Sequence, residues 1–261
     1  MDKRTSWQIQ KAVCKALFIR EVKTRFGGYR LGYLWALIEP LSHILVLSAL
    51  FSSIRDRADF YGTPFPVFFA TGILAYFAFQ KIVMTSLQSI RVNEGLFGYR
   101  QVKPFDAIIV RIGLEALINI ATLCFLVWLG AWVFGYDTFP DDPLLVVGVL
   151  LVLFMFGAGI GFFTAVIGML YEEWAKFIPH IMRPLYFLSG ILFPLQAIPE
   201  KFHVYLLWNP LLHGVEQFRA AYLTGYPAVK TSLSYIALWA ILSLLAGLWF
   251  YQTNRIRVLT R

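Results

Sequence analysis

The chain has 261 residues, of which 59% are apolar and 15% charged, with a mean hydropathy of +0.66 and a formal net charge of +8. This balance is far from that of a soluble domain and predicts an all-α integral membrane protein. A chain of this length forms a single transmembrane domain, residues 1–261, and leaves no room for a separate soluble catalytic domain of ordinary size. The two cysteines indicate neither a disulfide framework nor a metal site.

Residues 5–28 are predicted to form an amphipathic helix outside the membrane. Gln8, Lys11 and Lys15 share one narrow side of this helix, and apolar residues surround the remainder. Such a helix can lie in the membrane interface, where cationic side chains such as Arg25 and Arg30 contact anionic lipid headgroups. An ordinary cytoplasmic helix packed on a partner remains the alternative.

Apolar runs bounded by charged or turn residues predict six transmembrane helices, at residues 31–54, 65–90, 106–134, 143–170, 175–196 and 231–251. The fifth is the weakest, because its uninterrupted apolar stretch, Pro184 to Leu195, is too short to span a bilayer. Its prolines predict a kinked helix. In the fourth, Gly157, Gly161 and Ala165 are spaced by four, which favours close contact between helices.

Residues 197–230 are amphipathic and aromatic, but too interrupted to cross the bilayer. We expect two short helices, broken at Asn209-Pro210, that dip into the outer leaflet and return. Such a re-entrant segment is allowed only where protein or a water-filled cavity satisfies its backbone. An element of this kind suggests a gate.

The basic residues predict the orientation of the chain. With the N-terminus in the cytoplasm, the inner segments hold seventeen Lys or Arg and the outer segments hold five. This asymmetry predicts that both termini are cytoplasmic. The positive charge is therefore explained by topology, and no nucleic-acid partner is expected.

Several charged residues fall within the predicted spans. Counted from the inner helix ends, Glu39, Lys81 and Glu115 lie roughly 13 to 15 Å deep. Arg111 is one turn from Glu115, at a spacing that allows pairing, and Arg183 falls at a similar level. Isolated charges at this depth are costly, so we predict a cluster of Glu39, Lys81, Arg111 and Glu115. The cluster either pins the helices in register, lines a polar route for a hydrophilic substrate, or carries protons.

Aromatic residues make up 17% of the chain. Most are expected in interfacial belts and helix packing. Tyr205, Trp208 and Tyr222, in the re-entrant segment, are candidates for a lining along which sugar rings slide. The chain has no GxxxxGK[ST] loop, so ATP hydrolysis by the P-loop route is not expected. Its four histidines form no metal motif.

Two stretches carry a resemblance to a known family: RFGGYRLGYLWALIEPL, from Arg25 to Leu41, and WNPLLHGVEQFR, from Trp208 to Arg219. With six predicted spans, the chain resembles the membrane (permease) subunit of type-two ABC exporters, in the KpsM-like branch that exports capsular polysaccharide. The resemblance covers nearly the whole chain. Glu-Pro at 39–40 favours the capsule branch, because the related O-antigen exporters tend to have Asn-Pro there.

The resemblance implies two copies of this chain forming a channel in the bacterial inner membrane, with two copies of a cytosolic ATPase beneath. ATP and Mg would be bound by the ATPase, and no cofactor by this chain. The cargo would be a lipid-linked polysaccharide moved from cytoplasm to periplasm, in concert with a periplasmic polysaccharide co-polymerase and an outer-membrane channel.

The resemblance also implies roles for particular segments. The N-terminal helix would touch the ATPase, the inner loop at 91–104 would couple to it, and residues 197–230 would form the periplasmic gate. The coupling candidates are Glu94, Phe97, Arg100 and Glu172, and the lipid end of the cargo would enter near Arg25 and Arg30. An exporter of O-antigen, teichoic acid or a drug, and a membrane enzyme acting on lipid-linked sugars, remain alternatives.

Overall fold

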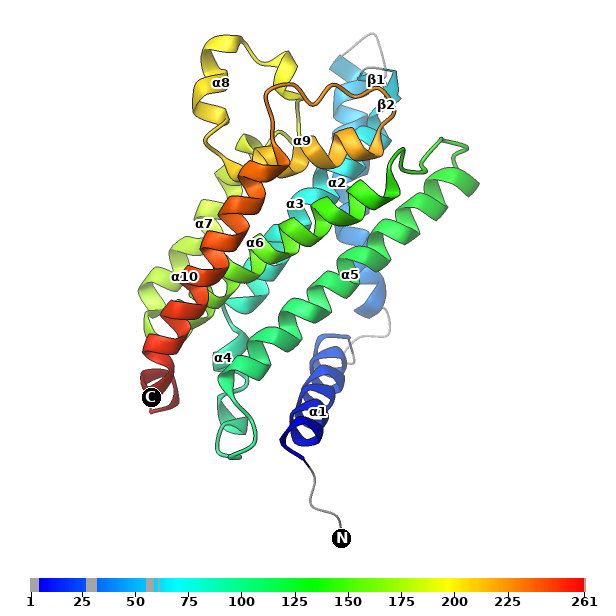
Figure 1. Cartoon of the computed structure of the whole chain (residues 1–261). Coiled ribbons are helices and arrows are strands. Elements are labelled where there is room, and N and C mark those ends of the chain that lie inside the picture. Colours follow the sequence, from blue (N-terminus) through cyan, green and yellow to red (C-terminus); the bar gives the residue numbers. More distant parts are fainter. Residues whose placement is uncertain (1–4, 27–31, 55–58, 61, 261) are drawn as a thin grey trace.

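A computed structural model describes residues 5–26, 32–54, 59, 60 and 62–260 (Figure 1). Helices make up most of the described chain. The described residues also contain one β-hairpin, in which β1 pairs with β2 and Asp59 lies opposite Pro64. The elements are α1 (Ser6–Phe26), α2 (Gly32–Ile54), β1 (Asp59–Phe60), β2 (Thr63–Pro64), α3 (Phe65–Ser86), α4 (Ser89–Val92), η1 (Glu94–Leu96), α5 (Pro104–Trp132), α6 (Pro143–Leu170), α7 (Glu172–Leu188), η2 (Leu195–Ala197), α8 (Glu200–Leu206), α9 (Pro210–Tyr222) and α10 (Leu233–Leu259).

Among the residues that the structure describes, five helices are long and apolar enough to cross a membrane: α2, α3, α5, α6 and α10. The expectation of an all-α membrane protein is therefore confirmed. Figure 1 shows α7 running between the same two ends of the molecule, although it has only 17 residues and contains Pro179 and Pro184. We call the end that holds α1, α4 and the C-terminus the α1 end, and the opposite one the α9 end.

Several predicted boundaries were wrong. The span predicted at 65–90 ends at Ser86, and the short helix α4 follows it. The span predicted at 175–196 ends at Leu188, because the chain turns at Gly190, which has a φ of +74° that favours glycine. The last helix continues to Leu259, eight residues beyond the predicted end.

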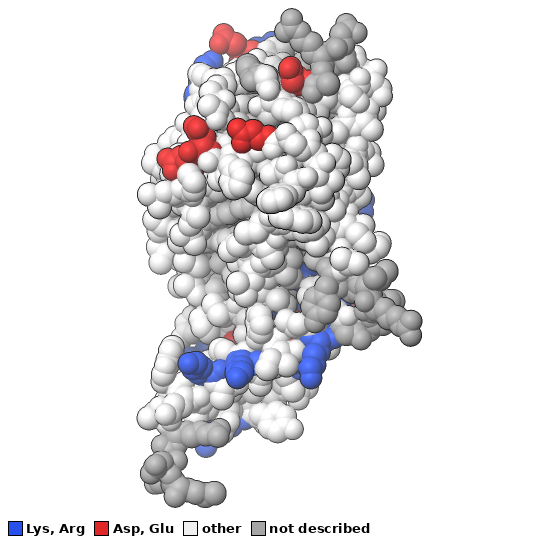
Figure 2. All heavy atoms as spheres, turned by 90° about the vertical axis from the view of Figure 1, so that its right-hand side faces the viewer, with Lys and Arg blue, Asp and Glu red and all other residues white. Residues whose placement is uncertain are grey.

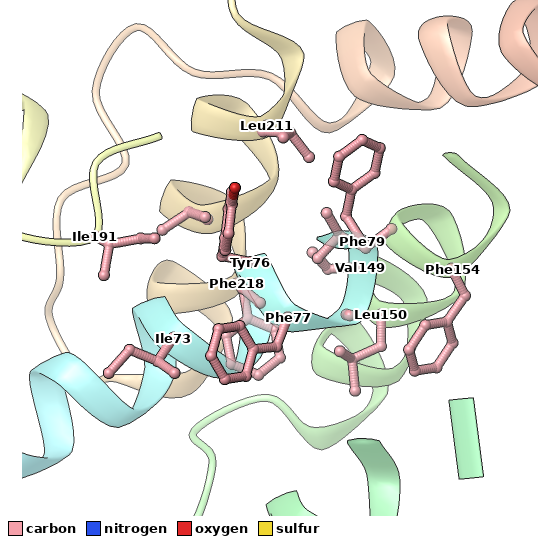
Figure 3. Packing of buried hydrophobic residues seen from close by; sticks show 14 of the residues in the cluster. Ile73, Tyr76, Phe77, Phe79, Val149, Leu150, Phe154, Ile191, Leu211 and Phe218 are labelled. Carbon is pink, nitrogen blue, oxygen red and sulfur yellow. The ribbon is translucent and has the colours of Figure 1, made fainter. Parts of the chain in front are cut away.

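Helix α3 lies at the centre of the bundle. In its apolar stretch 78% of the residues are buried, against 22% in α5 and 11% in α2. Figure 3 shows Ile73, Tyr76 and Phe79 of α3 packed among side chains of α6 and α9. Most side chains of α2 and α5 are therefore left to contact lipid or another protein.

The glycines of α6 let neighbouring helices approach closely. A Cβ at Gly157 would lie 3.2 Å from the carbonyl oxygen of Phe79 in α3, and one at Gly161 would lie 2.8 Å from the hydroxyl of Ser86. On another side of α6, a Cβ at Gly159 would overlap the backbone of α10 at Leu244. The predicted close contact is thus present, and it joins α3, α6 and α10 into one tightly packed group.

Charge is distributed unevenly between the two ends. On the face drawn in Figure 2, Lys and Arg form a row near the α1 end, whereas most Asp and Glu lie toward the α9 end, with a belt of uncharged surface between them. Helix α1 packs at the α1 end against the start of α5, with Val13 and Leu17 buried beside Val110. A belt of this kind is what the hydrocarbon region of a bilayer requires.

Candidate substrate path

Glu39 and Lys81 form an ion pair between α2 and α3, as predicted from their equal depth. Their side chains remain 38% and 27% exposed. The Lys81 ammonium also lies 4.9 Å from the centre of the Phe77 ring, where the aromatic face attracts a cation. Each charge is thus neutralised by a neighbour while part of its surface stays accessible.

Glu115 and Arg111 do not form the pair that was predicted. Glu115, whose side chain is 3% exposed, accepts a hydrogen bond from Arg25 of α1. Arg111 donates from Nε to Glu21 of α1 at 3.1 Å, and from Nη1 to the carbonyl of Thr85 at 3.0 Å. The expectation failed because α1, which lies outside the predicted spans, supplies oppositely charged partners to both residues.

The Glu39–Lys81 and Arg25–Glu115 pairs line one small cavity of about 40 Å³ between α2, α3 and α5. We call it the charged cavity. Asn119 also lines it. This side chain is 7% exposed and donates to the carbonyl of Leu74 at 3.2 Å, while its Oδ1 has no partner in the described structure. The cavity therefore offers an unused acceptor to a bound hydroxyl or water.

A second cavity, of about 120 Å³, adjoins the charged cavity on the side of the α9 end. The two share Leu74, and the second is lined mainly by apolar side chains of α2, α3 and α5, including Leu41, Ile44, Leu123 and Leu126. Polar and apolar linings thus follow one another along the same three helices.

One predicted path residue, Arg183, lies apart from the charged cavity, and one predicted headgroup contact, Arg30, lies outside the described residues. Arg183 is exposed on α7 and is not among the residues that line the charged cavity. Of the two predicted headgroup contacts, the structure describes Arg25, whose side chain is 34% exposed while it pairs with Glu115.

The aromatic candidates of the outer segment divide into two kinds. Tyr205 and Trp208 are 77% and 75% exposed. Tyr222 is only 6% exposed, and its hydroxyl donates to the carbonyl of Thr138. Tyr222 packs α9 against the segment that follows α5, and it also lines the second cavity, so its role as a path residue stays a prediction.

A buried ionic group in α9 was missed by sequence reasoning. Glu216 and Arg219 are both 0% exposed and pair at 3.3 Å. Arg219 also donates to the carbonyls of Gly190 and Ile191, and its guanidinium lies 3.8 Å from the centre of the Phe68 ring. The i,i+3 spacing of opposite charges was the available signal, but Arg219 had been counted as an ordinary outer charge.

Glycine at position 72 makes room for this arginine. A Cβ there would overlap the guanidinium nitrogen Nη2 of Arg219 and lie 3.2 Å from its Cζ. Tyr226 completes the group by donating its hydroxyl to Glu216 at 3.0 Å. Helix α9 is therefore fixed to α3 and to the turn after α7.

The coupling candidates lie at the α1 end. Glu94 and Arg100 are exposed, whereas Phe97 is half-buried and packs against a cluster that includes Ile108 and Phe162. Glu172 accepts a hydrogen bond from Arg91, which joins the start of α7 to α4. No three His, Cys, Asp or Glu gather as a possible metal site among the residues that the structure describes.

The chain combines several apolar spans, paired charges between them, and a further helix, α1, packed at one end against α5. These features can be compared with known proteins. The model of the family described as ABC-2 type transporter matches residues 12–223. The chain belongs to the ABC-2 type transporter family. The matched region begins within α1 and ends just after α9, so it contains the charged cavity and the Glu216–Arg219 pair of α9.

Several curated ABC-2 relatives match over most of their length. The chain is 41% identical to the polysialic acid transport protein KpsM of Escherichia coli, with 98% of this chain and 99% of the relative covered. It is 31% identical to the capsule polysaccharide export inner-membrane protein CtrC of Neisseria meningitidis serogroup B, covering 95% and 94%. It is 26% identical to the O-antigen export system permease protein RfbA of Klebsiella pneumoniae, covering 79% and 78%. These names describe membrane transport proteins rather than enzymes.

Proposed function

We propose that this chain is the membrane subunit of an ATP-driven exporter that moves lipid-linked capsular polysaccharide from cytoplasm to periplasm. The observation that carries the proposal is the 41% identity, over nearly the full length of both chains, to a polysialic acid transport protein. Identity of 31% to a capsule export protein supports the same branch. ATP hydrolysis belongs to a separate ATP-binding subunit.

In the proposed orientation the α1 end faces the cytoplasm. Support comes from the row of basic side chains at that end and from the rule that Lys and Arg collect on the cytoplasmic side. Both termini are then cytoplasmic, and α8 and α9 lie on the periplasmic side. Two copies of the chain form the channel, and a periplasmic co-polymerase and an outer-membrane channel receive the polysaccharide.

The charged cavity, of about 40 Å³, is smaller than a sugar ring, so a passing sugar chain would reach its polar groups only when the surrounding helices move apart. Its two acids and two bases cancel, so it carries no net charge, yet it offers hydrogen-bonding groups that hydroxyls can use. The exposed rings of Tyr205 and Trp208 provide faces on which pyranose rings stack weakly. Weak contacts of this kind allow a polymer to move onward.

The partner ATPase would act on the exposed α1 end. ATP binding would close its two subunits and displace α1 and the inner loop that carries Glu94 and Arg100. Since both residues are exposed, they are free to contact a partner. Movement of α5, which carries Glu115, would then alter the charged cavity.

Copurification tests the proposal most directly. We expect the chain to copurify with an ATP-binding subunit whose hydrolysis depends on both chains, and polysaccharide to accumulate in the cytoplasm when the chain is deleted. Combined replacement E94A/R100A should uncouple hydrolysis from export, with K103A at the same loop as a matched control. Unchanged export in E94A/R100A would remove the coupling assignment.

A charge swap distinguishes the roles of Glu39 and Lys81. If the pair is purely structural, the double variant E39K/K81E restores the export that each single reversal abolishes. If either group contacts the cargo, export stays low in the double variant although the protein accumulates.

Export of O-antigen is the second candidate function. The 26% identity to an O-antigen export permease favours it, but that match covers only 79% of the chain. Teichoic acid export belongs to the same class. Complementation of strains lacking either a capsule or an O-antigen exporter separates these cargoes: the proposal predicts rescue of the capsule strain only.

A further inference from the structure

Two ion pairs join α1 to α5, and they lie one helical turn apart on both helices. Glu21 accepts from Arg111, and four residues later on both helices Arg25 donates to Glu115. Residues four apart lie on the same face of a helix. The two pairs therefore form successive rungs between the facing sides of α1 and α5.

The signs of the charges alternate along both helices. On α1 the order is acid then base, and on α5 it is base then acid. A slide of α1 by one turn, about 5.4 Å, would bring Glu21 opposite Glu115 in one direction. In the other direction it would bring Arg25 opposite Arg111. Both shifted arrangements oppose like charges in a poorly solvated place, so the native register is favoured strongly.

Glu21 also ties these helices to the inner loop. Its Oε1 accepts a hydrogen bond from Asn93 Nδ2 at 2.9 Å, and its Oε2 accepts from Arg111 Nε at 3.1 Å. Asn93 joins α4 to η1, is 1% exposed, and accepts from Arg20 through its own Oδ1. With Glu21 8% exposed and both of its oxygens occupied, one carboxylate holds three elements together.

We infer that Glu21 is a positioning residue, and that the two-rung charge ladder makes α1, the loop at 87–103 and the first turns of α5 move as one body. A displacement of α1 or of the loop is then passed to α5 without slippage. It reaches Glu115, which lines the charged cavity one turn beyond Arg111. The role in transmission rests on the proposed function, whereas the register does not.

Thiol crosslinking tests the register. In a C14A/C124A background, L17C/V110C reports the native alignment, because Leu17 and Val110 pack in one apolar cluster. L17C/L114C reports a shift of one turn. With the native ladder we expect the first pair to crosslink at least fivefold more than the second. Adding E21R/R111E leaves two arginines on α1 and two glutamates on α5, so opposite charges face each other in the native and in the shifted register. The penalty for sliding is then removed, and the crosslinking yield of L17C/L114C should rise at least threefold. An unchanged ratio would overturn the ladder.

Export per ATP hydrolysed tests the transmission. E21Q keeps the size of the side chain but removes the charge, and we expect at least a fivefold fall in polysaccharide exported per ATP, with E21D recovering part of it. K23Q, which removes an exposed charge two residues further on, should stay within twofold of the unmodified protein. A purely structural role would lower the abundance of E21Q and leave export per ATP unchanged, which would overturn the inference.

The two assays also separate this inference from the proposed function. If the unmodified chain copurifies with no ATP-binding subunit, the proposed function fails and the transmission role fails with it. The crosslink ratio still reports the register in that case. If the ATPase and export are present but E21Q stays coupled, the inference about Glu21 alone is wrong.

Discussion

Helices α8 and α9 lie in the same segment between α7 and α10, yet they are held in different ways. Of the residues in α9, ten are buried, whereas in α8 only His203 is. Helix α9 is fixed by Arg219, which donates to the carbonyls of Gly190 and Ile191. Helix α8 is held by the exposed Glu200–Lys230 pair, by a hydrogen bond between His203 and the carbonyl of Ile198, and by one between His213 of α9 and the carbonyl of Leu207. A short segment of chain thus contains one rigid helix and one weakly attached helix.

This difference indicates which part of the outer segment can move. Displacement of α9 would take the buried Arg219 guanidinium away from the carbonyls of Gly190 and Ile191 and from the Phe68 ring, a cost of several kcal/mol. Displacement of α8 breaks an exposed ion pair, which contributes little. If this segment forms a gate, α8 would be the part that moves. Tyr205 lies on α8 and would move with it, and Trp208 follows two residues after its end.

Replacement of Arg219 should give the largest effect. R219A leaves Glu216 buried with Tyr226 as its remaining side-chain partner, and exposes two carbonyls to an empty space. We expect a loss of about 3 to 5 kcal/mol in stability, measured as a fall in thermal unfolding temperature in detergent. The control variant R183A removes an exposed arginine, and its loss of stability should be far smaller. Equal losses would contradict the rigid attachment of α9.

Enlargement of Gly72 should give the next effect. G72A places a methyl group against the Arg219 guanidinium, which is held by two carbonyls and cannot move aside freely. Overpacking of this kind costs roughly 1 to 3 kcal/mol. G113A is the control, because a Cβ at Gly113 in α5 meets nothing within 4 Å. A G72A protein as stable as G113A would show that the arginine pocket is adaptable.

Truncation of the exposed rings on the α8 side should separate stability from transport. Y205A and W208A remove side chains that are 77% and 75% exposed, so stability should change by no more than about 0.5 kcal/mol. If these rings contact the sugar chain, export falls in both variants at normal protein abundance. V204A, at an aliphatic position on α8 that is 66% exposed, should export normally.

The smallest effect concerns acid. The hydrogen bond and charge of Lys230 hold the pKa of Glu200 below its ordinary value of 4.5. Because the folded-state pKa is lowered, the contribution of this pair is complete above pH 4.5 and is lost as the pH falls through the lowered value. Hydrogen exchange of α8 amides at pH 7 should be slightly faster in K230A than in the unmodified protein. The two proteins should converge at low pH, and a difference that persists in acid would exclude this pair as the attachment.

The sequence predicted the helical membrane fold, and the pairing of Glu39 with Lys81, because the hydropathy of each span and the depth of each charge can be counted along the chain. The partners of Arg111 and Glu115 could not be found that way. They lie on α1, and the position of a helix outside the spans depends on tertiary packing. The predicted break at Asn209-Pro210 is present between α8 and α9, since proline at the first helical turn is a local signal.

Exposure was the hardest property to predict. Tyr222 and Arg219 lie on an amphipathic helix, and its pattern shows that one side is buried without showing against what. The packing of Phe68 and Gly72 of α3 around Arg219 is a contact between positions more than a hundred residues apart. Local spacing carries no information about such a contact, so the sequence placed Arg219 in an outer segment without indicating that its side chain is fully enclosed.

The cancellation of charge in the charged cavity has a consequence for selectivity. A cavity with a net charge attracts an ion of opposite sign, and this ion must overcome the same electrostatic attraction before it can leave. Here every charge already has a counter-ion. Under the proposed function, an anionic sugar that approaches Lys81 or Arg25 would have to displace Glu39 or Glu115, and the displaced carboxylate would re-form its pair when the sugar leaves. If the proposed path carries the polysaccharide, passage by such an exchange of partners would keep the free-energy profile shallow for charged and neutral repeat units alike.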